Sequence, residues 1–137
     1  MKIMLVSPYD FTYPSGANNH IIHLAAEYQA SGHDIRILAP ASPGRPLPAI
    51  DGFRALGTPV PIHSNGSTAR ITLSPTLSRQ VKRVLAEERP DVIHLHEPLM
   101  PTLPLTVLWQ AETRTVGHNE PTSYSSLARL RTQGPQP

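Results

Sequence analysis

The chain has 137 residues with 12 basic and 10 acidic side chains, and a net charge of +2 gives no reason to expect a nucleic acid as partner. It contains no cysteine, which excludes a disulfide framework and a cysteine zinc site. The length suits one domain, and because neither a signal peptide nor a membrane-spanning run is visible, we expect a cytoplasmic chain.

The first thirty residues predict a strand, a glycine-containing loop and a helix. Residues 2–7 form a short apolar run typical of a buried parallel strand, and apolar side chains then recur with helical spacing from residue 17 to residue 31, before Gly32. Such a unit places free backbone N–H groups and the positive end of a helix at the carboxyl edge of a sheet, where a phosphate can bind. Gly16 would let an anion approach the backbone, although a loop glycine also serves simply as a turn residue.

Three polar residues stand where this first helix begins. Asn18, Asn19 and His20 can bond to a polar ligand, and asparagine at such a position can equally cap the helix. The sequence leaves both interpretations open.

The next segments predict a second strand and a hairpin. Asp34–Ala39 is a buried strand joined to the first by a right-handed crossover, and four prolines make residues 40–48 an extended loop. Short strands are expected within residues 50–62. The dipeptide at positions 65 and 66, Asn-Gly, lies between two strand-like runs and predicts a tight hairpin turn.

The second helix is expected to start with Ser74 as N-cap and Pro75 as its first residue, and to run to about Glu88. Its apolar residues share one face, and the basic residues gather on the other, at Arg79, Lys82 and Arg83. This basic ridge is either an ordinary solvated face or, with Arg70 nearby, a contact for anionic lipid head groups.

The third core strand, within residues 91–98, ends in His94, His96 and Glu97. The two histidines share a face of the strand. We expect hydrogen-bonded pocket residues here and no metal site, because a third convincing ligand is missing. A helix with Pro104 near its start is expected within residues 99–112, and a fourth strand within residues 113–117.

The predicted fold is therefore an α/β domain over residues 1–117, with a Rossmann-like parallel sheet flanked by helices. Residues 118–137 are expected to form an irregular and partly disordered tail.

Five segments in this order resemble the amino-terminal half of retaining glycosyltransferases of family 4, which have the two-domain GT-B fold. The likeness is greatest to the phosphatidyl-myo-inositol mannosyltransferase group. The segments cover residues 1–9 (MKIMLVSPY), 14–20 (PSGANNH), 32–34 (GHD), 65–70 (NGSTAR) and 91–98 (DVIHLHEP).

The resemblance implies a nucleotide-diphosphate sugar as donor, a polar or lipid-linked acceptor, and no tightly bound cofactor. It places Gly16 near the donor diphosphate and His118 at the position of the active-site histidine. It also implies a set of acceptor-side residues, namely Tyr9, Asn18, Asn19, His20, Asn65, Ser67 and Arg70.

Our leading hypothesis is the acceptor-side domain of a retaining glycosyltransferase, inactive alone because the donor-binding domain is not in this sequence. The alternative is a non-catalytic module that docks through Arg79, Lys82 and Arg83 on a partner subunit or on an anionic membrane, at its inner face. A metal-dependent hydrolase using His94, His96 and Glu97 is the weakest hypothesis.

Overall fold

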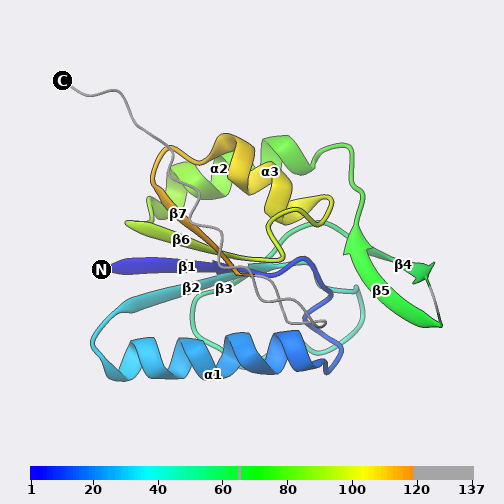
Figure 1. Ribbon diagram of the computed structural model, residues 1–137, viewed down its shortest axis with the longest axis horizontal. Coiled ribbons are helices and arrows are strands. Elements are labelled where there is room, and N and C mark those ends of the chain that lie inside the picture. The colour runs from blue at the N-terminus through cyan, green and yellow to red at the C-terminus, as the bar shows by residue number, and fades with distance from the viewer. Residues whose placement is uncertain (65, 119–137) are drawn as a thin grey trace.

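The computed structural model describes residues 1–64 and 66–118. Their main feature is a parallel five-stranded sheet in the order β3-β2-β1-β6-β7, with α1 on one face and α2 and α3 on the other (Figure 1). The sheet consists of β1 (Lys2–Val6), β2 (Asp34–Ala39), β3 (Phe53–Ala55), β6 (Val92–His96) and β7 (Arg114–His118). The helices are α1 (Gly16–Ala30), α2 (Leu77–Glu88) and α3 (Leu103–Gln110). The predicted α/β fold, a Rossmann-like sheet flanked by helices, is confirmed.

The central strand β1 is buried on both sides because successive side chains point to opposite faces. Ile3 and Leu5 pack in the cluster under α1, while Met4 and Val6 pack in the cluster under α2 and α3. This double burial explains the continuous apolar run at the start of the sequence.

Helix α1 has the apolar face that the periodicity predicts. Ile21 and Ala25 are buried, and Leu24 and Tyr28 pack against the same cluster. The helix is capped by Ser15, whose hydroxyl oxygen accepts a hydrogen bond from the Asn18 backbone N–H at 3.1 Å.

The start of α2 differs from the prediction. The helix begins at Leu77, because the Ser74 hydroxyl accepts a bond from the Thr76 N–H and the Ser74 carbonyl accepts one from the Leu77 N–H, which closes a separate turn around Pro75. The N-cap position belongs to Thr76, which makes no side-chain capping bond.

Helix α3 is shorter than predicted. It begins at Leu103, after a turn in which the Met100 N–H donates to the Glu97 carbonyl. Pro104 lies in its first turn, as predicted.

The hairpin predicted from the Asn-Gly dipeptide is confirmed. Strands β4 (Pro59–Ser64) and β5 (Ser67–Thr72) pair antiparallel, and Gly66 adopts a φ of +78° that a two-residue turn requires. Asn65 itself and the side chain of Ser67 lie outside the described part of the chain. A bridge between Tyr9 and Ile71 attaches the hairpin to the first loop.

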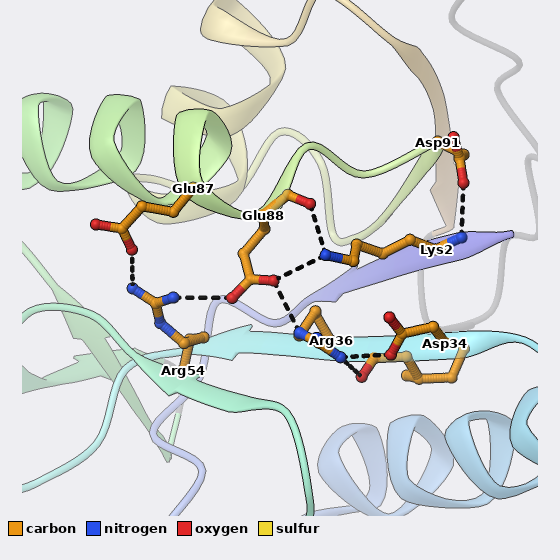
Figure 2. Close-up of polar contacts among 8 residues, drawn as sticks. Lys2, Asp34, Arg36, Arg54, Glu87, Glu88 and Asp91 are labelled. Atoms are coloured by element: carbon orange, nitrogen blue, oxygen red, sulfur yellow. Dashed lines mark hydrogen bonds and ion pairs between the residues drawn. The ribbon is translucent and has the colours of Figure 1, made fainter.

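An ion-pair cluster fixes the carboxyl end of α2 to the sheet (Figure 2). The Glu88 carboxylate accepts bonds from Arg36 on β2 and Arg54 on β3, both at 2.8 Å, and pairs with Lys2 on β1 at 3.4 Å. Burial opposes ionisation of Glu88, but the bonds from Arg54 and Arg36 outweigh it and lower its pKa. One carboxylate thus connects α2 to three neighbouring strands.

The final described strand includes His118, which the sequence analysis placed at the start of the tail. The rest of that predicted tail, residues 119–137, lies outside the described part of the chain. Among the described helices, none combines the length and apolar character needed to cross a bilayer.

Candidate functional site

The candidate site lies at the carboxyl edge of the sheet, where β1, β6 and β7 end. Strands β6 and β7 finish side by side, with His96 directly opposite His118 in the parallel register. The loop after β1 leads into α1, and His20, one turn after the start of that helix, lies against the rings of His96 and His118. This is the edge at which open parallel sheets bind their ligands.

Four histidine rings form one cluster at this edge. The His94 and His96 rings stack with centroids 4.5 Å apart, which confirms that they share a face of β6. The His118 ring lies 5.4 Å from that of His20, in a stacked arrangement, and 5.7 Å from that of His96. Only the strand register and the position of α1 bring these four residues together, so their sequence spacing could not predict the cluster.

The inner two histidines are neutral at ordinary pH. Burial, followed by the positive charge that neighbouring histidines can carry, lowers the pKa of His94 to about 4 and that of His96 to about 3. His96 is completely buried, and within the described part of the chain neither of its ring nitrogens has a hydrogen-bond partner. A neutral imidazole offers one donor and one acceptor, which suits hydroxyl groups.

The residue after this strand, Glu97, has a left-handed backbone with φ of +52°. Its N–H donates to the His118 carbonyl at 2.7 Å, so the ends of β6 and β7 are tied together beyond the last paired residues. This backbone conformation is unfavourable in free energy for a residue with a Cβ atom, and such strain is concentrated at functional sites.

The amide of Asn18 orders the first loop. It is buried, donates to the carbonyls of Asp10 at 3.0 Å and Tyr13 at 3.3 Å, and accepts from the Ser7 hydroxyl at 3.0 Å. Both amide protons are therefore used in hydrogen bonds inside the chain. The predicted contact of Asn18 with a sugar-acceptor substrate stays a prediction. Asn19 is exposed on the next position of α1.

Asp10 is the second residue that shapes this loop. Its carboxylate accepts bonds from the backbone and hydroxyl groups of both Thr12 and Ser42. Burial alone would raise its pKa, but these hydrogen bonds outweigh burial and lower it. Asp10 thereby joins the first loop to the proline-rich loop of residues 40–48.

A pocket of about 280 Å³ lies between the first loop and the hairpin, and we call it the Arg70 pocket. Its lining includes Tyr9, Tyr13, Ser15, Ala17 and Arg70. The structure therefore brings Tyr9 and Arg70, two predicted acceptor-side residues, into one cavity beside the start of α1.

Two guanidinium groups stack on Tyr13, one of the two tyrosines that line this pocket. The Cζ atoms of Arg45 and Arg70 lie 3.8 Å and 4.0 Å from the centre of the Tyr13 ring. Three residues of this region were not predicted from the sequence, namely Arg45, Tyr13 and Asp10. Of these, only Asp10 carried a local signal, a Thr two residues later that allows a side-chain turn.

Gly16 is exposed at the first position of α1, and a Cβ atom placed on it would have no neighbour within 4 Å. The backbone there is open to an incoming group. The basic ridge of Arg79, Lys82 and Arg83 is exposed on α2, on the face of that helix that points away from the sheet, and is not part of the edge site. In the described part of the chain, no group of three or more histidine or carboxylate side chains is arranged to hold a metal ion.

Comparison with known proteins gives consistent matches. The sequence pattern of glycosyltransferase family 4 matches residues 14–124. Phosphatidyl-myo-inositol mannosyltransferases from Mycolicibacterium smegmatis and Mycobacterium tuberculosis are each 40% identical over 134 residues, which cover 98% of this chain and 34% or 35% of theirs. The enzyme of the same name from Propionibacterium freudenreichii is 40% identical over 80% of this chain and 30% of its own length. The chain thus spans about a third of these relatives.

Among solved structures, the catalytic domain of starch synthase IV from Arabidopsis thaliana, bound to ADP and acarbose, superposes with a TM-score of 0.46 and 15% identity. The match covers 86% of this chain and 33% of that one.

Proposed function

The chain belongs to glycosyltransferase family 4, and we propose that it forms the acceptor-side wall of a cleft in which a sugar passes from a nucleotide sugar to an acceptor. One observation carries this proposal. The histidine cluster, the Arg70 pocket and the open start of α1 meet at a single edge of the sheet.

The chemistry of sugar transfer needs a stabilised leaving diphosphate and a fixed acceptor hydroxyl. The amino end of α1 supplies N–H groups and a positive dipole end, and Gly16 leaves room for an anion there. His118 and His20 stand at the rim of the same edge and can orient sugar hydroxyls. The buried ring of His96 packs edge-on against the rings of both His20 and His118, at 5.8 Å and 5.7 Å between centroids, and helps to hold them at this edge.

The Arg70 pocket suits an acceptor that carries a phosphate. The guanidinium of Arg70 stacks on Tyr13, and among the described residues it has no ion pair, so its N–H groups can make a bidentate contact with a phosphate. Because relatives at 40% identity are named phosphatidyl-myo-inositol mannosyltransferases, we propose mannosyl transfer to an inositol phospholipid or a similar lipid-linked polyol.

The cleft needs a second wall. This chain spans about a third of the length of its relatives, and the Arg70 pocket that its described residues form is open to solvent. We propose that a donor-binding domain, on a longer chain or on a partner subunit, completes the site. The acceptor-side domain alone then binds the acceptor but does not transfer sugar.

Nitrogen-15 NMR titration with glycerophospho-myo-inositol tests the acceptor assignment on the chain as it is. We expect shifts at Tyr9, Ser15 and Arg70, and their loss in Arg70→Gln but not in Arg79→Gln, which removes an equal charge from α2. Absence of shifts up to millimolar ligand, or equal shifts in both variants, would refute the acceptor pocket.

A second candidate function is docking on an anionic membrane surface through the basic ridge. Arg79, Lys82 and Arg83 are all exposed, and within residues 1–64 and 66–118 none of them has an ion pair. Each unpaired cation near an anionic bilayer contributes about 1 kcal/mol to binding. Co-sedimentation with anionic vesicles should be lost when all three become Glu, and equal sedimentation of both proteins would remove this candidate.

A further inference from the structure

The outer side of the α2–α3 layer carries an unusual exposed residue. Trp109 is the only tryptophan of the chain, and 89% of its surface is exposed. Leu105, one turn earlier on α3, is 42% exposed. A tryptophan that stays in water after folding keeps a large apolar surface hydrated, which is unfavourable. Such a side chain is typical of a contact surface.

The positions of the buried residues show which way these side chains point. On α3, Leu103 and Val107 pack against the sheet, so Leu105 and Trp109, two positions further along the helix, project roughly the opposite way. On α2, the buried residues Leu77, Val81 and Val84 likewise leave the basic ridge facing away from the sheet. Because α2 and α3 cover the same face of the sheet (Figure 1), the tryptophan and the basic ridge are exposed on the same side of the molecule.

A direct contact also places the two features next to each other. The Gln110 side-chain amide donates to the Ser78 carbonyl at 2.9 Å and to the Ser78 hydroxyl at 2.8 Å. Trp109 and Arg79 are the chain neighbours of these two residues. Lys82 and Gln110 line a shared groove of about 430 Å³, whose floor is apolar at Leu85 and Ile93.

The charges on this face are unbalanced. Lys82 and Arg89 stand at the groove with Glu112 as the acidic residue among its lining, while Arg79 and Arg83 add positive charge on α2. The exposed Glu87 on the same helix is held by Arg54 at 2.7 Å. Positive charge beside an apolar groove and an exposed indole is complementary to anionic head groups above acyl chains.

We propose that this outer face of α2 and α3 is a bilayer-docking surface on which Trp109 is the interfacial anchor and the basic ridge contacts anionic lipid phosphates. The proposal rests on the second candidate function, and adds to it an apolar anchor on a different helix. Tryptophan prefers the head-group level of a bilayer, where its ring is buried and its N–H stays hydrated.

The sole tryptophan makes the test direct. Vesicles of phosphatidylcholine with phosphatidylglycerol, and vesicles of phosphatidylcholine alone, are titrated while Trp109 emission is recorded, and then acyl-brominated lipids are used as quenchers. We expect a blue shift and quenching with the anionic vesicles. Trp109→Ala should bind about fiftyfold more weakly in the sedimentation assay, because burying half of an indole of about 200 Å² is worth nearly two decades of affinity. Leu47→Ala, which removes an exposed apolar side chain from the proline-rich loop, should bind as the wild type does.

The outcomes separate the two proposals. If the wild type does not sediment with anionic vesicles, docking and its anchor both fail. If it sediments but Trp109 shows no shift or quenching, or if Trp109→Ala binds equally well, the anchor is refuted while docking through the basic ridge stands.

Discussion

The neutral histidines beneath the candidate site predict a domain that loses stability in mild acid. In the unfolded chain His94 and His96 bind protons as pH falls through 6.5, whereas in the folded protein their pKa values are about 4 and about 3. Since the unfolded state binds more protons over this window, stability is present above pH 6.5 and decreases as pH falls below it. At pH 5 each histidine costs about 2 kcal/mol, together about 4 kcal/mol.

That loss is large compared with the roughly 5–15 kcal/mol that stabilises a typical domain. The assay is urea unfolding followed by circular dichroism at pH 8, 6 and 5, with His96→Leu beside the wild type. The variant removes one of the two groups and its unpartnered nitrogens, so we expect about half of the pH dependence and no loss of stability at pH 8. His23→Gln, an exposed site on α1, is the control and should follow the wild type.

Two results would refute this reasoning. One is a wild-type free energy of unfolding at pH 5 within about 1 kcal/mol of its value at pH 8, set against the calculated 4 kcal/mol. The other is a His96→Leu protein that keeps the full pH dependence, which would assign the protons to groups outside the cluster.

Three further substitutions test the fold around the site. Glu88→Ala leaves three partly solvated cations facing each other. We expect the free energy of unfolding in urea at pH 7 to fall by about 2 kcal/mol, a value between those for exposed and for fully buried ion pairs. No change would mean that the cluster in Figure 2 contributes nothing to stability. Gly57→Ala should lower the stability measured by thermal unfolding by about 2–3 kcal/mol, because φ is +75° and the new Cβ would come within 2.8 Å of the Thr72 Cβ. An unchanged melting temperature would contradict that packing. Asp10→Asn should speed amide hydrogen exchange in the loop around Ser42 while β1 stays protected, and equal exchange there would show that the carboxylate does not hold the loop.

Periodicity and turn chemistry were sufficient to predict the β1, α1 and β2 unit and the hairpin, since these depend on local patterns such as the apolar face around Ile21 and the glycine at position 66. The start of α2 was wrong because the Ser74 hydroxyl closes a turn of its own, a choice that local sequence does not decide.

The site depended more on tertiary structure. His20 and His118 come together through the position of α1 and the register of β7, and Arg45 meets Tyr13 across a separation of 32 residues. No spacing in the sequence encodes those meetings. The two histidines of β6 were predictable as neighbours, because residues two apart on a strand share a face.

Sugar transfer by a chimera tests the central claim most directly. This chain would replace the matching 134 residues of the Mycolicibacterium smegmatis relative, with the Mycobacterium tuberculosis segment as positive control, and mannosyl transfer would be measured with the substrates of the parent enzyme. We predict transfer by the chimera and none by this chain alone. Gly16→Ala in the chimera should lower transfer about a hundredfold. Its added Cβ meets nothing inside the protein, so the loss would come from obstruction of the donor diphosphate. Gln29→Ala on the exposed end of α1 should stay active. A folded chimera that is inactive beside an active control, or one unaffected by Gly16→Ala, would contradict the account.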